Sequence, residues 1–390
     1  MENILAQQIF QASDNFVQTI GGELNKTKSF SFGHECLQNS IDAAISHHDS
    51  FRLLGGSITY RSPNQSKATA FGLTKLDKWT KTIKRCRHLP VTWSERCSAL
   101  MRTRSQYTWG SGCHTLCTAK THEDPIIKSR SSIMRCLLRR DQYIANPSMY
   151  FCLITPPSLN HLFARVIDGL CTARRVLIFS SQADDLKARF QQDAVPNFDG
   201  PISFLKQVNE MSGFEHCVDK LIQYGLTEPE QWLHEIRSVW RKEQFKRIAA
   251  NRPAFDGVQH GVDRDSTIHH LRQTERYEPL LREDLLQNAA VLRLLLTGGL
   301  FTQSINSRHR KRGPTDCTST VGGEQTVEHV SWYCSYHHDL RIPILHLFHL
   351  IIQASPAFRF ASIITQRDAA LQPHIQLIQS VLIRIWRAHI

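Results

Sequence analysis

The sequence predicts a mainly α-helical protein with a small α+β unit at its N-terminus, and three patterns support this fold class. Apolar residues near the N-terminus recur every three or four positions, as they do on the buried face of a helix. Two short stretches after this helix show the alternating or glycine-containing apolar pattern of strands. Most of the remaining chain returns to helical spacing. With 390 residues, 41% of them hydrophobic, the chain is long enough to bury more than one core.

The N-terminal unit is predicted to contain one helix and two strands. The helix covers residues 3–20 and is followed by Gly21, a residue type that readily adopts the left-handed conformation that ends helices. Residues 28–33 alternate polar and aromatic side chains, which indicates a strand. Residues 51–60 are short, apolar and glycine-containing, and they predict a second strand. An α+β unit over residues 1–65 follows from these elements.

The chain after this unit is predicted to be helical. Helices are expected at residues 67–87, 92–106, 161–177, 201–223, 227–249 and 278–297. Pro90 separates the first two helices, because proline cannot continue a helix. Glycine and proline make residues 252–267 a predicted surface connection and residues 194–201 a predicted linker.

The balance of charges predicts a polyanionic partner. The chain contains 47 lysines and arginines against 35 aspartates and glutamates, which gives a formal net charge of +12. Cationic side chains that neutralise phosphates release counterions, so nucleic acid is the first candidate partner. The candidate nucleic-acid-binding residues are Lys78, Lys81, Lys84 and Arg85 in one segment and Arg310, Lys311 and Arg312 in another. The alternative interpretation is that these runs are solvated faces or a sorting signal.

Aromatic and basic residues are also mixed in one of the predicted helices. Trp240 and Phe245 stand among Arg241, Lys246 and Arg247. Such a face can stack on bases or contact phosphates. The favoured interpretation is that the aromatic residues belong to the core and the cations form its solvated rim.

The compartment expected from the sequence is intracellular, in the nucleus or the cytoplasm. The N-terminus lacks the basic segment and apolar core of a secretory signal. The longest apolar run, residues 342–352, is too short to cross a bilayer and is interrupted by proline and histidine. The 11 cysteines are irregularly spaced, which does not indicate a disulfide framework.

Two motifs in the N-terminal unit resemble the end of the palm domain of non-LTR retrotransposon reverse transcriptases. The first is the turn Gly22-Glu-Leu-Asn-Lys-Thr-Lys-Ser29, and the second is Phe51-Arg-Leu-Leu-Gly55. The resemblance implies that Lys28 is a proton donor to the leaving pyrophosphate. It also implies that the primer end is positioned by Phe51, Leu54 and Gly55.

The alternative for this unit is an unrelated α+β fold whose turns match by chance. A pair of strands at residues 28–33 and 51–60, packed on the helix at residues 3–20, would favour the palm remnant. An all-helical N-terminus would exclude it.

The resemblance implies a division of the chain into four regions. They are a palm remnant with a primer-grip-like strand (residues 1–65), a thumb-like helical region (66–150), a helical connector (151–300), and a degenerate zinc-binding segment with C-terminal helices (301–390). A thumb would use its basic residues to hold the backbone of an RNA and DNA template-primer without reading its sequence. No membrane partner is expected, and the oligomeric state stays open.

The aspartate hairpin that holds magnesium in these polymerases is expected to be missing, because Met1 stands where the helix after it should begin. Residues 182–185, Gln-Ala-Asp-Asp, look similar to this hairpin but follow the primer-grip match, the wrong order for the family. Asp184 and Asp185 are instead expected in the first turn of a helix. Magnesium is therefore expected only in a full-length parent polymerase, and this chain alone is predicted to be inactive.

A second resemblance to the same polymerases lies near the C-terminus, where they carry a zinc-binding segment. Cys317, His329 and Cys334 match three ligands of its pattern, but Thr320 stands where a second cysteine is expected. A neutral hydroxyl is a poor replacement for a thiolate on zinc. The sequence therefore predicts either a weak zinc site, completed by a nearby histidine such as His337, or a unit that folds without metal by burying apolar side chains.

The function implied by the resemblance is that of a truncated reverse transcriptase fragment, which binds template-primer nucleic acid without the catalytic aspartates. One alternative is a basic helical nucleic-acid-binding module without enzymatic ancestry, which explains the charge but not the two N-terminal motifs. The other is a partner-binding helical scaffold. Such a scaffold would expose apolar patches in place of a basic surface.

Overall fold

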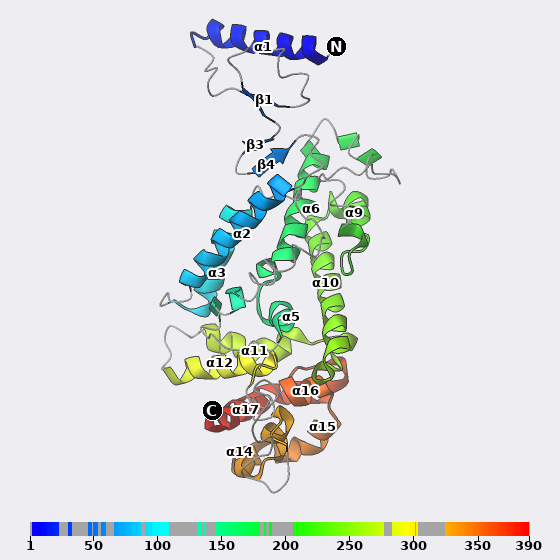
Figure 1. Cartoon of the computed structure of the whole chain (residues 1–390). Helices are drawn as coiled ribbons and strands as arrows, with labels where there is room; N and C mark the ends of the chain where they lie inside the picture. The colour runs from blue at the N-terminus through cyan, green and yellow to red at the C-terminus, as the bar shows by residue number, and fades with distance from the viewer. Residues whose placement is uncertain are drawn as a thin grey trace.

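The described part of the chain is mainly helical, which confirms the mainly α character of the predicted fold (Figure 1). The computed structural model describes residues 2–22, 30–32, 46–48, 50–53, 56–59, 66–86, 91–108, 132–134, 136–137, 146–179, 183–184, 187–188, 206, 208–276, 283–300, 302 and 324–389. Among these residues, strands occur only in the N-terminal part.

Helix α1 (Glu2–Thr19) confirms the predicted N-terminal helix and its glycine cap. Gly21 has a φ of 76°, which is the left-handed region. Its amide donates to the Gln18 carbonyl at 3.0 Å, and the Gly22 amide donates to the Val17 carbonyl at 2.8 Å. These two bonds form a Schellman motif and satisfy carbonyls that the helix end leaves unpaired.

The strands form two separate two-stranded sheets. They are β1 (Phe30–Phe32), β2 (Ser46–His48), β3 (Ser50–Leu53) and β4 (Gly56–Thr59). Strand β1 pairs with β2 in parallel, and β3 pairs with β4 as an antiparallel hairpin in which Phe51 lies opposite Ile58. The described residues within 51–60 therefore form a hairpin and not one strand, and in the described sheets β3 and β4 do not pair with β1. A palm-like arrangement is not shown.

The helical body begins after the β3–β4 hairpin. Its α-helices are α2 (Ser66–Cys86), α3 (Trp93–Thr108), α5 (Pro147–Met149), α6 (His161–Phe179), α9 (Cys217–Lys220), α10 (Pro229–Asn251), α11 (Arg264–Arg276), α12 (Glu283–Leu296), α14 (His338–Arg341), α15 (Phe348–Gln353), α16 (Pro356–Ala361) and α17 (Ile375–His389). The helices predicted at residues 67–87, 92–106, 161–177, 227–249 and 278–297 are confirmed as α2, α3, α6, α10 and α12.

Short π-helices and 3-10 helices connect these α-helices. The π-helices are η4 (Tyr150–Ile154), η6 (Leu221–Gly225) and η10 (His329–Tyr333). The 3-10 helices are η5 (Pro157–Leu159), η7 (Pro253–Phe255), η8 (Val258–His260), η11 (Ser335–His337), η12 (Ile342–Leu347) and η13 (Gln366–His374).

The single helix predicted at residues 201–223 is wrong. In the described part of this range, the chain leaves the helical conformation at Met211 and re-enters it at α9. Gly213 has a φ of 90° and His216 a φ of 58°, and neither value is compatible with a continuous right-handed helix. The spacing of apolar residues is similar on both sides of the break, so periodicity alone did not reveal it.

The surface connection predicted at residues 252–267 is only partly confirmed. Pro253 is exposed, but Phe255 and Val258 are buried in the core, and the Thr267 side chain is fully buried. The segment is therefore a structural link between α10 and α11. Its two short 3-10 helices pack on α10 and α16.

Large aromatic residues hold the helices together. Trp79 of α2 is fully buried and its indole donates to the Thr103 hydroxyl of α3 at 3.3 Å, which closes the α2–α3 pair. Trp93, at the start of α3, donates to the Tyr150 hydroxyl of η4 at 3.0 Å. The rings of Phe163 and Trp240 join α6 to α10 with a centroid distance of 4.6 Å. Such buried aromatic contacts contribute both apolar area and specific geometry.

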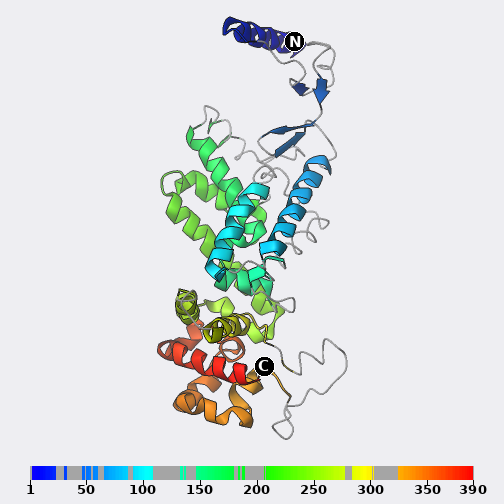
Figure 2. The same cartoon turned by 90° about the vertical axis from the view of Figure 1, so that its left-hand side faces the viewer.

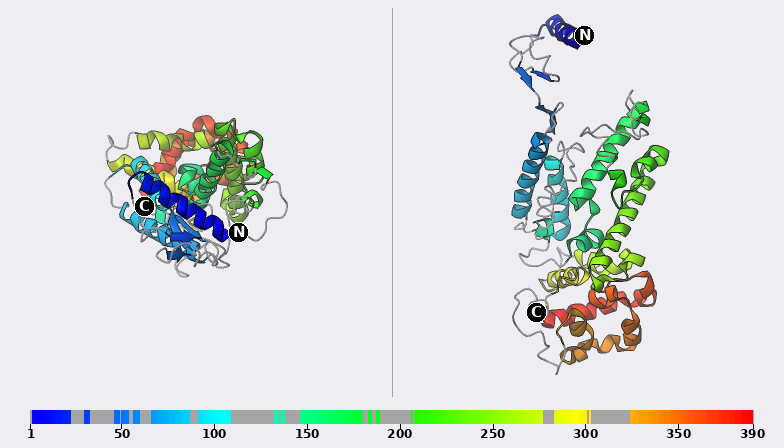
Figure 3. Two further views of the ribbon diagram at one scale, coloured as in Figure 1. Left: turned by 90° about the horizontal axis from the view of Figure 1, so that it is seen from above. Right: turned by 45° about the vertical axis from the view of Figure 1, so that its right-hand side comes forward.

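The C-terminal helices α14 to α17 lie below the α2–α3 pair and the α6–α10 pair in Figure 2 and in the right-hand view of Figure 3. Helix α17 packs against both α11 and α12, so the end of the chain contacts its middle. Trp386 of α17 is fully buried, and its indole donates to the Ser331 hydroxyl of η10 at 3.2 Å. In the described residues, no helix is long and apolar enough to cross a membrane.

A buried polar network centred on Asp368 fixes the C-terminal body. The carboxylate, in a residue 2% exposed, accepts hydrogen bonds from the amide and hydroxyl of Ser355 at 2.8 and 2.7 Å. It also accepts from the amide and hydroxyl of Thr365 at 3.1 and 2.6 Å. A buried carboxylate with four donors is satisfied, which is the condition for burying such a group at low cost.

Candidate nucleic-acid interface

Helix α2 separates its apolar and basic residues onto opposite faces. Trp79, Ile83 and Cys86 recur at helical spacing and are buried against α3. Among the described side chains of this helix, the cationic ones are all exposed; they are Lys78, Lys81, Lys84 and Arg85. Because successive residues turn by about 100° around a helix, these four positions fall within one third of the circumference, opposite the buried stripe. The name α2 basic face refers to these four residues below.

The α2 basic face is only weakly neutralised within the described residues. Lys81 forms an ion pair with Asp77 at 2.8 Å, but both side chains are more than half exposed. Exposed pairs of this kind contribute about 0–1 kcal/mol and are easily replaced. Lys84 and Arg85 also lie in the last turn of α2, where cations stabilise the helix dipole. This dipole interaction is the structural explanation for part of the basic run.

A capping box fixes the start of α3 and therefore the angle of the α2–α3 pair. The Glu95 carboxylate accepts from the Thr92 amide at 2.9 Å, and the Glu95 amide donates to the Thr92 hydroxyl at 3.2 Å. This reciprocal arrangement satisfies amides that the helix start leaves free. Hydrogen bonds from Thr92 lower the pKa of Glu95 below its ordinary value. At the other end of the pair, strand β4 contacts α2.

Most of the residues predicted from the palm resemblance lie outside the described part of the chain. They are the predicted proton donor Lys28 and the predicted primer-positioning residues Leu54 and Gly55, whereas the backbone of Phe51 is described in β3. The β3–β4 hairpin lies beside the first turns of α2 (Figure 2). Asp184 lies in helical backbone and forms an exposed ion pair with Lys187 at 3.5 Å, in agreement with its assignment to a helix.

The predicted zinc segment is only partly described. His329 begins η10 and Cys334 follows its end, where the Cys334 amide donates to the His329 carbonyl at 2.8 Å. Cys334 is buried, but two side chains do not complete a tetrahedral zinc site. In the described residues, no three histidine, cysteine or acidic side chains gather closely enough to hold a metal. Zinc binding stays a prediction, because Cys317, together with Arg310, Lys311 and Arg312, lies outside those residues.

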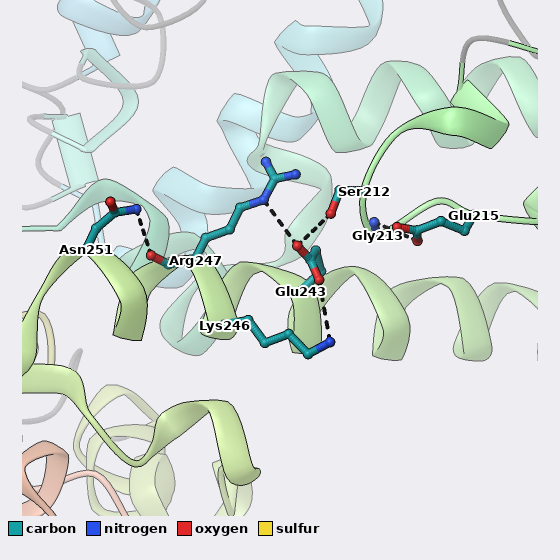
Figure 4. Close-up of polar contacts among 7 residues, drawn as sticks. All are labelled: Ser212, Gly213, Glu215, Glu243, Lys246, Arg247 and Asn251. Carbon is teal, nitrogen blue, oxygen red and sulfur yellow. Dashed lines mark hydrogen bonds and ion pairs between the residues drawn. The ribbon is translucent and has the colours of Figure 1, made fainter.

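The mixed aromatic and basic stretch of α10 belongs mainly to the core. Trp240 and Phe245 are buried, which favours the interpretation of the aromatics as core residues. Lys246 and Arg247 instead surround Glu243, whose carboxylate lies 3.8 Å from the lysine nitrogen and accepts from the Arg247 Nε at 3.3 Å (Figure 4). These two cations already have an anionic partner. They are therefore less available to phosphates than the α2 basic face.

Glu243 also anchors the turn that interrupts the predicted helix at residues 201–223. The Ser212 hydroxyl donates to its carboxylate at 2.5 Å, and this bond is the main cause of a lowered pKa for Glu243 (Figure 4). Gly213 follows, and a side chain there would meet the Glu243 Cβ at 3.2 Å. The turn thus approaches α10 closely enough to require a glycine.

The sequence-based prediction missed a set of arginines where η4, α10 and α11 meet. Its members are Arg237, Arg241, Arg264 and Arg272, referred to below as the arginine cluster. Each electrostatically influences at least one other member, although they come from two helices. No sequence pattern indicates that α10 and α11 both contact η4, so the cluster could not be predicted from the sequence. Arg272 also lines a cavity of about 280 Å³ between α11 and α17.

Comparison with known proteins adds no further assignment. The chain matches no protein-family model, no curated protein sequence and no solved structure. The candidate interface is therefore defined by its own geometry and charge alone.

Proposed function

We propose that this chain binds the phosphate backbone of nucleic acid through the α2 basic face, as the C-terminal part of a polymerase similar to non-LTR retrotransposon reverse transcriptases. The observation that carries the proposal is the exposure of all four cations of this face, opposite the stripe that packs on α3. A rigid helix pair with one solvated basic surface can contact phosphates without remodelling its core. The template-primer of the resembling polymerases is the ligand that fits this surface.

The expected binding mode is electrostatic and independent of base sequence. If each of the four cations neutralises one phosphate, the logarithm of affinity for duplexes should fall with the logarithm of salt concentration with a slope of about −3.6. That slope corresponds to a loss of roughly a hundredfold between 50 and 200 mM salt. Contacts to the backbone position the nucleic acid but do not select its sequence.

The experiment that tests this proposal is a salt titration of binding to a primed RNA template, measured by fluorescence anisotropy. The variant Lys78→Gln/Lys81→Gln/Lys84→Gln/Arg85→Gln should bind much more weakly and with a shallower slope. A matched control removes four basic residues from other elements, by Lys242→Gln, Lys246→Gln, Arg252→Gln and Arg384→Gln. Equal losses in both variants would show that net charge matters and that the α2 basic face does not.

The same proposal expects no polymerase activity from this chain alone. The resemblance places the magnesium-binding aspartates in a hairpin that precedes the matched motifs, and it assigns no such pair to residues of this chain. The purified chain should therefore incorporate no nucleotide on a primed RNA template with magnesium. Incorporation that depends on the template would contradict this expectation.

A partner-binding scaffold is the second candidate, and one observation favours it. Several large apolar side chains are exposed in the C-terminal body, namely Tyr333, Tyr336, Ile342, Leu345 and Ile352. Exposed apolar side chains that gather on one surface are typical of protein interaction sites. If removal of the α2 cations leaves nucleic-acid binding unchanged, this surface becomes the preferred candidate.

A further inference from the structure

The arginine cluster begins with Arg264, the first residue of α11. Its Nε donates to the Leu153 carbonyl in η4 at 2.8 Å. Both α10 and α11 contact η4, so this bond holds the guanidinium at the junction of the three elements. Burial, together with the charges of Arg241 and Arg272, lowers the pKa of Arg264 to about 10. The guanidinium is thus fixed in a place that is unfavourable for a cation.

Arg241 lies on the face of α10 that points to this junction. The residue is partly exposed, but its Nε is buried and no described group accepts a hydrogen bond from it. Burial lowers the pKa of Arg241, and the charges of Arg237 and Arg272 act in the same direction. A buried donor without an acceptor costs about 1–3 kcal/mol. The Arg241 Nε is therefore a buried donor that the fold does not satisfy.

The acidic residue among these arginines is Asp265, and it is committed to another partner. Its carboxylate accepts from Arg272 at 2.8 Å in an exposed ion pair. The four arginines of the cluster carry four positive charges and Asp265 carries one negative charge, which leaves a surplus of +3. Within the described residues, Asp265 is the carboxylate whose charge acts on Arg241 and Arg264.

We propose that Arg241, Arg264 and Arg272 form a binding site for a phosphate group. Guanidinium groups match tetrahedral oxyanions because they donate two parallel hydrogen bonds from a planar fork and are weakly hydrated. A phosphate monoester carries a charge of about −1.5 to −2 at neutral pH, so it offsets most of the surplus. A carboxylate, with one charge, would offset less.

This site is separate from the α2 basic face, because it is built on η4, α10 and α11. It also differs in kind, since its arginines are partly desolvated and oriented by contacts within the fold. The phosphate can come from the free inorganic ion or from the 5′-phosphate end of a nucleic acid. The chemistry at the guanidinium groups is the same for both sources.

The test measures binding of inorganic phosphate to the full-length chain by calorimetry and by the rise in melting temperature, at constant ionic strength set with sodium chloride. Phosphate should stabilise the wild-type chain and the control variant Arg252→Gln, which removes an exposed cation at the end of α10. Arg241→Gln should lower the affinity for phosphate by about tenfold or more, because it removes a charge-assisted donor. Arg272→Gln, at an exposed position that can be changed without harm to the core, should also lower it.

A second arm identifies the source of the phosphate. An oligonucleotide with a 5′-phosphate is compared with the same oligonucleotide without it, in wild type and in Arg241→Gln. If only the phosphorylated oligonucleotide loses affinity in the variant, the site takes a nucleic-acid end. If inorganic phosphate alone depends on Arg241, the site takes the free ion. If neither ligand distinguishes wild type from Arg241→Gln, or from Arg272→Gln should the first variant fail to fold, the proposal is wrong.

Discussion

The α2–α3 pair and the C-terminal body, residues 324–389, use their polar residues in opposite ways. The cations of the α2 basic face are exposed to solvent, and α2 and α3 are held together by apolar side chains around Trp79. In the C-terminal body, polar groups such as Asp368 are buried and paired with residues from other elements. The cations of the α2 basic face are accessible to a partner, whereas the buried charge of Asp368 is used in hydrogen bonds within the fold.

The difference predicts where a substitution will show its effect. Changing a buried polar residue of the C-terminal body should alter stability, and changing a cation of the α2 basic face should alter binding. The arginine cluster lies between these cases, because its members are partly buried and yet incompletely paired. Such groups lower stability and are retained where a ligand completes their interactions.

The largest expected effect is that of Asp368→Ala. The substitution leaves the amides and hydroxyls of Ser355 and Thr365 buried without their acceptor, so the free energy of unfolding should fall by roughly 3–5 kcal/mol. Urea unfolding monitored by circular dichroism measures this change. Asp339→Ala, at an exposed position of the same body, is the control and should change stability by less than about 0.5 kcal/mol. A loss below about 1 kcal/mol for Asp368→Ala would remove the contrast between the regions.

The next effect concerns binding and should leave stability untouched. Lys78→Gln/Lys84→Gln removes two exposed cations, so the salt slope of nucleic-acid binding should become shallower by about 1.8. The free energy of unfolding should stay within about 0.5 kcal/mol of the wild-type value. A slope that does not change, measured by anisotropy at several salt concentrations, would mean that these lysines contact no phosphate.

A smaller effect, opposite in sign, is expected for Arg241→Met in buffer without phosphate. The substitution removes a partly buried cation with an unpaired donor and keeps much of its apolar volume, so stability should rise by about 1 kcal/mol. Arg264→Met is the matched comparison, because it also removes a cation but breaks the bond to the Leu153 carbonyl. It should lower stability. A loss of stability in both variants would show that Arg241 is a structural cation.

The smallest expected effect is a change in the acid sensitivity of the C-terminal body. His337 is buried, and neither of its ring nitrogens has a hydrogen-bond partner in the described residues. Burial is the main cause of its lowered pKa, and the nearby His389 and Arg341 act in the same direction. A lowered pKa in the folded state means that stability is present above the unfolded pKa of about 6.5 and is lost as the pH falls.

Replacing this imidazole should therefore reduce the acid sensitivity. His337→Phe removes a group that must stay neutral in the fold, so the decrease in melting temperature between pH 7 and pH 5 should become smaller. The exposed His338→Gln serves as the control and should leave the decrease unchanged. An identical pH profile for wild type and His337→Phe would contradict the assigned cause.

Sequence patterns predicted the helices well, because their signals are local. Apolar spacing located α2 and α10, Pro90 marked a boundary, and Gly21 marked the end of α1. The failures occurred where distant residues decide the structure. Strand pairing depends on which partner is available, so the hairpin of β3 with β4 was mistaken for a single strand.

The same distinction between local and distant signals applies to the candidate site. The α2 basic face could be read from the sequence, because its cations and its buried stripe share one helix. The arginine cluster could not, since Arg241 and Arg264 come from different helices and meet only because both contact η4. Likewise, the Thr365-x-x-Asp368 spacing is that of a local capping box, but no local pattern indicates that Asp368 is buried. The two bonds from Ser355 become visible only in the folded structure.

The position of Thr267 in the chain has a consequence for synthesis on the ribosome. Its hydroxyl accepts from the Ile364 amide at 3.0 Å, and its carbonyl accepts from the Gln379 side chain at 2.9 Å. Both partners are translated about a hundred residues after Thr267. Although domains often fold as they emerge, the buried polar groups at the start of α11 gain these partners only after residue 379 has been synthesised. A nascent chain released before α17 has been synthesised would therefore lack hydrogen-bond partners at the start of α11. Quality-control proteases can recognise such an incompletely folded chain.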